Sequence, residues 1–244
     1  MAILFFLVAV LYSSVGHAGA SGYLMVMALC DMESAQMRPT ALVLNLFVAS
    51  LTVYRFHKAG HMHPKACIPL LAGSIPLAFL GGATPLSAAV YKALVGVCLA
   101  AASARLLFTQ PADQENGVPP LPGVMTGAVI GLLAGLTGTG GGIFLTPCLI
   151  FAGWQGARNA AGTSALFILV NSVSGLAAMP SSLAALPSGM PMYVVAAIAG
   201  GLIGSWLGSR RLEIPRLRQV LALVLAVAAA HIFHAAWLTH LKGG

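Results

Sequence analysis

The chain has 244 residues, of which 59% are hydrophobic and only 7% are charged, and its mean hydropathy is +0.92. This composition excludes a water-soluble globular protein, because too few polar side chains are present to cover its surface. The formal net charge of +7 does not indicate nucleic-acid binding, since the basic residues lie in short loops beside apolar segments, where they orient a membrane protein. The long apolar runs, rich in Leu, Ala and Val, predict an all-α polytopic membrane protein rather than a β-barrel.

The first half of the chain, residues 1–108, is predicted to contain one interrupted apolar segment and three ordinary helices. The segment at about 1–30 contains glycines, and because it lacks a basic n-region and a cleavage site we expect it to be retained. Helices are expected at about 36–57, 66–86 and 87–108. A polar, proline-rich linker at 109–119 follows.

The second half, residues 120–244, has the same plan. Its interrupted segment at about 120–151 contains the sequence GLTGTGGGIFLTP. Helices are expected at about 157–180, 190–209 and 215–238. A shift of about 120 residues brings Gly22 onto Gly142, Arg38 onto Arg158 and Leu46-Phe47 onto Leu166-Phe167. The sequence therefore predicts a duplicated unit.

The distribution of the 12 Lys and Arg residues distinguishes two topologies. If every segment crosses the membrane, the better assignment puts seven basic residues on one side and five on the other. If both glycine-broken segments return to their own side, six crossings remain and the division becomes nine to three. The second topology fits better, and it predicts a multi-pass membrane protein with both termini outside the cytoplasm.

Glycine allows each interrupted segment to turn back as a re-entrant hairpin. Each arm would have about 12–15 residues, or roughly 18–22 Å of helix, which reaches the region of the midplane. Unwound backbone at that depth is tolerated where it is buried in protein or lines a wet cavity. Three crossings per half invert the second copy, so the two tips would approach each other, as in transporters built from inverted repeats. The alternative is that the glycines only allow close helix packing.

Such tips favour an anionic ligand, because each returning helix begins with free N–H groups at the positive end of its dipole. Neutral hydroxyl and amide groups nearby can add donors, although ordinary interhelical hydrogen bonding explains each of them equally well. All five acidic residues fall in loops or at helix ends, which disfavours a cation carrier. The predicted substrate-binding residues are Ser13, Ser14, Gly16, His17, Gly19, Ser21, Gly22, Asn45, Thr137, Gly138, Thr139, Gly140, Gly141, Gly142, Ser164 and Asn171.

No cofactor, metal or catalytic centre is expected. The glycines after Thr137 do not match the dinucleotide pattern, because Ile143 occupies the place of its last glycine and no βαβ unit surrounds them. The four cysteines form no C-x-x-C pair. Basic residues surround the histidine tract, which is therefore expected to face lipid headgroups in a cytoplasmic loop; its members are His57, His61 and His63.

Three further residues each have two interpretations. His17 is the titratable side chain expected near the centre, where it could exchange a proton or donate to an oxyanion, or pack as a neutral, hydrogen-bonded histidine. Arg38 and Arg158 follow the two hairpins, where they could draw anions towards the entrances or extend to the membrane interface.

The motifs GLTGTGGGIFLTPCLI with AAGTSALF, and YSSVGHAGASGYL with GSRRLEIPRLRQVLALVLA, resemble the TauE/SafE family of sulfite and organosulfonate exporters. The resemblance implies an inner-membrane permease that exports sulfite, sulfoacetate or a related anion, and it points to Gly138, Gly140, Gly141, Gly142 and Pro147. The expected partners are a small anionic substrate and the lipid bilayer. Two alternatives stay open: an importer or facilitator of another small anion or sulfur compound, and an intramembrane enzyme, which lacks a catalytic constellation at depth.

Overall fold

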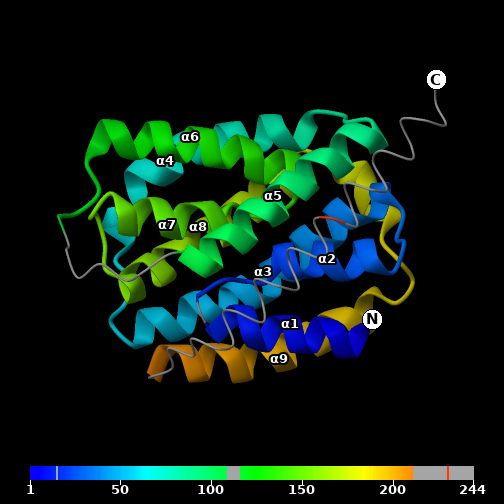
Figure 1. Ribbon diagram of the computed structural model, residues 1–244, viewed down its shortest axis with the longest axis horizontal. Helices are drawn as coiled ribbons and strands as arrows, with labels where there is room; N and C mark the ends of the chain where they lie inside the picture. Colours follow the sequence, from blue (N-terminus) through cyan, green and yellow to red (C-terminus); the bar gives the residue numbers. More distant parts are fainter. Residues whose placement is uncertain (15, 109–115, 211–229, 231–244) are drawn as a thin grey trace.

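The computed structural model describes residues 1–14, 16–108, 116–210 and 230. These residues form helices and no strand (Figure 1). The elements are α1 (Ala2–Ser14), α2 (Ala20–Leu29), α3 (Ser34–Lys58), α4 (Pro64–Ala83), α5 (Ala88–Phe108), α6 (Pro120–Thr137), α7 (Gly142–Phe151), α8 (Ala157–Ala177), a 3-10 helix η1 (Pro180–Ala185) and α9 (Met190–Arg210).

Five of these helices, α3, α4, α6, α8 and α9, are long and apolar enough to cross a membrane. The prediction of an all-helical, multi-pass membrane protein is therefore confirmed. The helix expected at about 215–238 lies outside the described residues.

The helices lie roughly parallel to the long axis of the molecule in three layers (Figure 1). Helices α1 and α9 pack together on one face, and α4 and α6 pack together on the opposite face. Between them α3 packs against α8, and each of these two also contacts an outer helix, α9 for α3 and α4 for α8. The short helices α2 and α7 pack against α3 and α8 respectively.

Rows of glycine allow the two outer helix pairs to pack closely. Gly127, Gly131 and Gly135 of α6 face backbone atoms of α4, and a Cβ at Gly131 would lie 2.5 Å from the carbonyl oxygen of Ser74. On the other face, a row on α9 meets carbonyl oxygens of α1; its members are Gly200, Gly204 and Gly208. Small residues four apart are the usual means by which membrane helices approach one another. Close helix packing, which was the alternative role considered for the glycines, therefore applies to the glycines of α6.

The second interrupted segment begins and ends at the same end of the molecule. The N–H of Asn116 donates to the carbonyl of Gly153 and the N–H of Gly117 to that of Trp154, each at 3.0 Å. These bonds join the chain just before α6 to the chain just after α7. The arms are unequal, with 18 residues in α6 and 10 in α7, so the expected 12–15 residues per arm was wrong here. The glycine row extends α6 along most of α4, whereas α7 has no such partner.

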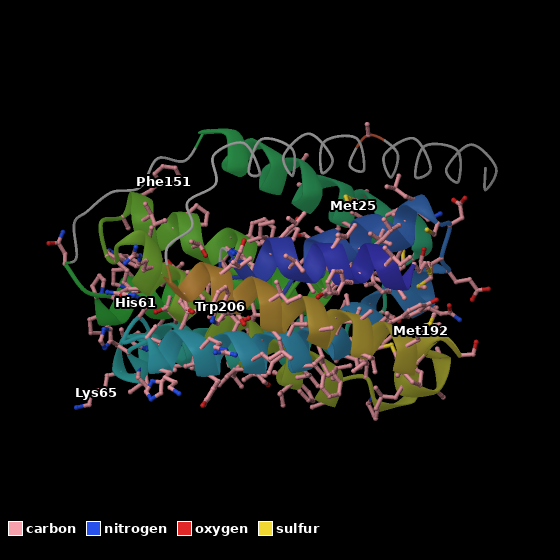
Figure 2. The ribbon with its side chains drawn as sticks, turned by 90° about the horizontal axis from the view of Figure 1, so that it is seen from below. Met25, His61, Lys65, Phe151, Met192 and Trp206 are labelled. Atoms are coloured by element: carbon pink, nitrogen blue, oxygen red, sulfur yellow. The ribbon has the colours of Figure 1, made fainter. Side chains whose placement is uncertain are left out.

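The first interrupted segment begins at the opposite end of the molecule. Figure 1 shows α2 returning toward the end at which α1 begins. The ring of Phe5 in α1 packs edge-to-face against Tyr23 of α2 and Tyr193 of α9, with centroid distances of 5.4 and 5.0 Å. Residue Met192 lies at this end, and His61, Lys65 and Phe151 lie towards the other end (Figure 2). The two glycine-broken segments therefore enter from opposite ends.

Candidate functional site

Left-handed glycines form both tips. They are Gly16 (φ 80°) and Gly19 (φ 98°) in the first tip, and Gly138 (φ 78°), Gly140 (φ 71°) and Gly141 (φ 82°) in the second. Only glycine adopts this conformation without strain. Gly19 and Gly141 are the N-caps of α2 and α7, so neither helix has a side chain to cap its first N–H groups.

The spacing of these glycines corrects the register expected between the two halves. The left-handed pair Gly16 and Gly19 corresponds to Gly138 and Gly141, which are also three residues apart. This correspondence is displaced by two residues from the pairing of Gly22 with Gly142. Gly22 instead faces α1, where a Cβ would lie 2.8 Å from the ring of Tyr12. The comparison of the two halves by residue identity misaligned the tips, because the sequence does not distinguish a glycine that packs against a helix from a glycine that forms a turn.

His17 connects the two tips. Its side chain is 4% exposed, and Nε2 lies 3.1 Å from the carbonyl oxygen of Gly142 and 3.1 Å from Oγ1 of Thr146. A carbonyl oxygen only accepts, so Nε2 carries the proton and donates it. The Thr146 hydroxyl lies 2.7 Å from Oγ of Ser164, which extends the connection to α8. His17 is thus a buried, hydrogen-bonded bridge.

Thr146 was missed among the predicted site residues. It lies four positions after Gly142 on α7, and its hydroxyl also donates to the Gly142 carbonyl at 3.1 Å. Residues four apart share one face of a helix, so the signal was present in the sequence. A threonine in an apolar helix was too common a feature to single out.

The second tip contacts α3 through Asn45. A Cβ at Gly140 would lie 2.9 Å from Asn45 Nδ2 and 2.7 Å from Cγ2 of Ile168. The Asn45 amide donates to Oγ of Ser172 at 3.3 Å, which joins α3 to α8. The structure therefore brings Asn45 and Gly140, both predicted from the sequence, into contact.

Hydroxyl groups surround the end of α6. The hydroxyls of Thr137 and Thr139 lie 2.9 Å apart, and the Tyr91 hydroxyl donates to the Thr137 carbonyl at 3.2 Å. Tyr91 comes from the first turns of α5 and was not predicted. Nothing in its local sequence separates it from an interfacial tyrosine.

Several buried polar atoms have no hydrogen-bond partner within the part of the chain that the structure describes. Asn171 is 1% exposed, and neither its Nδ2 nor its Oδ1 makes a hydrogen bond to a described residue. The same is true of Asn45 Oδ1 and Ser13 Oγ, whose side chains are fully buried. An unpaired buried polar group costs about 1–3 kcal/mol, so a polar ligand that supplied partners would be bound favourably.

The remaining predicted residues have local roles. Ser14 Oγ donates to the Leu11 carbonyl at 2.6 Å, as serine does inside a helix. Gly19 faces the ring of Tyr23 on its own helix. Ser21 is 3% exposed within α2. All the predicted substrate residues are buried, but the contacts of Ser14 and Gly19 are with the first segment itself.

The candidate site has no carboxylate among the residues that the structure describes. Of the acidic residues that the structure describes, Asp31 and Glu33 are exposed. Within the described ranges no group of three or more His, Cys, Asp or Glu side chains could hold a metal ion. The first turns of α2 and α7 present partial positive charge, and hydroxyl and amide groups lie around them. This arrangement favours a small anion over a cation.

Comparison with known proteins gives two matches over nearly the whole chain. A family model described as "Sulfite exporter TauE/SafE" matches residues 1–232. The chain is 37% identical over 236 residues to a protein of Sinorhizobium fredii (strain NBRC 101917 / NGR234) named "Probable membrane transporter protein y4hK"; the match covers 93% of this chain and 95% of that protein. No solved structure matches.

Proposed function

Since the chain belongs to the TauE/SafE sulfite exporter family, we propose that it exports a small sulfur-containing anion, sulfite or an organosulfonate such as sulfoacetate. Membership of this family makes the chain a membrane transporter and not an enzyme. The intramembrane enzyme considered as an alternative is therefore excluded.

One observation carries the proposal: two glycine-broken tips enter from opposite ends and meet at the bond between His17 and Gly142. The anion would rest beside this junction, on the first N–H groups of α2 and α7. The unpartnered amide of Asn171 and the hydroxyl of Ser13 are candidate additional ligands. We propose His17 as the group that holds the tips together around the anion.

The proposed topology has both broken segments as re-entrant hairpins in inverted repeats. The exchanged packing supports it, because α6 of the second half packs on α4 of the first, and α1 of the first packs on α9 of the second. The basic residues support an inner-membrane orientation. Four of them lie at the end shared by His61 and Lys65, namely Arg55, Lys58, Lys65 and Arg158, whereas Arg38 and Lys92 lie at the other end. The first end would face the cytoplasm.

Export of an anion requires no coupling ion in this arrangement. Moving one negative charge out of a cell with a negative interior is favourable by about 2.3 kcal/mol for each 100 mV of membrane potential. A site without buried carboxylates, as found among the described residues, is compatible with such potential-driven movement.

The test is flux of radiolabelled sulfite in proteoliposomes that contain the purified protein. We expect flux that exceeds that of protein-free liposomes, rises with an imposed potential and is inhibited by unlabelled sulfoacetate. Sulfate and chloride serve as comparison anions. Flux of chloride or sulfate without flux of sulfite or sulfoacetate would refute the sulfur-anion assignment and favour the alternative of another small anion.

A further inference from the structure

Arg38 lies on α3 near the non-cytoplasmic end of the proposed topology, and its guanidinium reaches the end of α4. Its Nη2 donates to the carbonyl of Gly81, and its Nη1 donates to the carbonyl of Thr84 at 3.3 Å. These carbonyls belong to the last turn and C-cap of α4, where a cation is favourable. One role of Arg38 is therefore to cap α4.

No carboxylate within residues 1–14, 16–108 and 116–210 pairs with Arg38. Among the residues that the structure describes, its only hydrogen-bond partners are the two carbonyls, and Nε is buried without a partner. Guanidinium carries five donors and is most often paired with a carboxylate or an anion when it leaves water. Asp31 and Glu33, which precede it on the chain, are exposed. Arg38 thus retains positive charge and unused donors.

The second tip lies directly against Arg38. A Cβ at Gly138 would lie 3.1 Å from Cγ of Arg38 and 3.1 Å from its carbonyl oxygen. The hydroxyls of Thr137 and Thr139 flank Gly138, and Tyr91 donates to the Thr137 carbonyl. The backbone and the side-chain stem of Arg38 therefore lie against the second tip, and its guanidinium reaches from there to the end of α4.

The place that Arg38 takes at the second tip is held by an alanine at the first tip. Its left-handed Gly16 lies against Ala161, and Ala161 occupies the same place near the start of α8 that Arg38 occupies near the start of α3. Arg158, which the sequence paired with Arg38, lies almost one turn earlier on α8 and is exposed. The two tips are alike in backbone, but the residue that α3 places against the second tip is an arginine and the residue that α8 places against the first tip is an alanine.

We propose that Arg38 forms an anion-binding subsite at the non-cytoplasmic mouth, where a small oxyanion rests after it leaves the junction of the tips. The ligand class is sulfite or a sulfonate, in which two oxygen atoms on the same sulfur can accept paired N–H donors. The identity of the anion rests on the proposed function; the subsite itself rests on the guanidinium, which has no carboxylate partner among the described residues, and on the contact of the Arg38 stem with Gly138.

Sulfite uptake into membrane vesicles of defined orientation tests the subsite. Right-side-out vesicles present the Arg38 end to the added anion, and inside-out vesicles present the other end. For R38Q we expect the sulfite concentration for half-maximal uptake to rise about tenfold in right-side-out vesicles, as for loss of one charged hydrogen bond, and to change little in inside-out vesicles. R38K, which keeps the charge, should lie between. R158Q removes the same charge from an exposed position and should change neither value.

A second measurement separates binding from capping of α4. The thermal stability of detergent-solubilised protein is measured with and without sulfite. We expect R38Q to lose much of the sulfite-dependent stabilisation and R158Q to retain it. If R38Q lowers thermal stability but keeps the wild-type sulfite dependence in both measurements, Arg38 is a helix cap alone and the subsite is wrong. If the wild-type protein neither moves sulfite nor is stabilised by it, the proposed function and the subsite fail together for this anion.

Discussion

Substitution of Gly140 by alanine tests the tip of the second hairpin with the smallest perturbation available. At φ 71° a non-glycine residue has a left-handed backbone, which costs roughly 1–2 kcal/mol. The added Cβ would also lie 2.7 Å from Ile168 and 2.9 Å from the Asn45 amide. Both distances are too short for carbon and nitrogen, so Asn45 must move away from its hydrogen bond to Ser172.

Gly60 provides a matched control. Its φ of 77° is nearly the same, but a Cβ there would meet no atom within 4 Å. Gly60→Ala therefore carries the backbone cost alone, and Gly140→Ala carries the same cost together with displacement of Asn45. The difference between the two variants isolates the contact at the tip.

We expect both variants to insert into the membrane. Gly60→Ala should lose about 1–2 kcal/mol of folding free energy, and Gly140→Ala should lose more, because it also displaces Asn45. Only Gly140→Ala should lose sulfite flux, by about tenfold, because displacing Asn45 costs about 1.4 kcal/mol at the site. Flux is measured in proteoliposomes at equal protein content, and thermal stability in detergent. Equal flux for the two variants would show that the second tip does not bind the transported anion.

Three other predictions follow from the same structure. Asn171→Leu should raise thermal stability by about 1–3 kcal/mol, because it removes a buried amide without partners, and should lower sulfite flux; lower stability with normal flux would contradict this role. Gly131→Leu should prevent α6 from packing on α4 and reduce the yield of folded protein, measured by size-exclusion chromatography; a normal yield would mean that this contact is not required. In a protein whose native cysteines are replaced, Ala59→Cys and Ala152→Cys should react with an impermeant thiol reagent added at the cytoplasmic face, and Asp31→Cys should react with reagent added at the other face. Reaction of Ala152→Cys from the same face as Asp31→Cys would refute the re-entrant second hairpin.

The long helices and the existence of both breaks could be predicted from the sequence. Apolar runs of about 20 residues have no alternative to a helix in lipid, so α3, α4, α8 and α9 are determined locally. The unequal lengths of α6 and α7 could not be predicted, because they depend on packing between segments far apart in the chain. The glycines at 127, 131 and 135 match α4, and this match is visible only once the helices are paired.

The candidate site was only partly predictable for a similar reason. Residues at the breaks, such as His17 and Gly140, could be identified because glycine and polar residues in an apolar run are locally unusual. Thr146 and Tyr91 act through contacts with these residues from other elements. Arg38 was identified but paired with Arg158 by sequence position, whereas the backbone pairs it with Ala161. A displacement of the register by a few residues decides which side chain meets a tip, and a weak internal repeat does not determine the register that closely.

The difference between the two tips gives the two faces of an otherwise repeated architecture different affinities for the anion, while the electrochemical gradient sets the direction of net movement. Each tip presents helix N–H groups, so the backbone alone would bind an anion from either side with similar strength. Arg38 adds positive charge on one side, and Ala161 adds none on the other. An anion at the junction of His17 and Gly142 would therefore meet a more favourable potential towards the Arg38 end, and the membrane potential acts in the same direction. Tighter binding of the anion at Arg38 also slows its release from this face. R38Q should therefore weaken binding from that face and, at saturating sulfite, should leave the maximal flux unchanged or higher. A fall in maximal flux without any change in affinity would contradict this account.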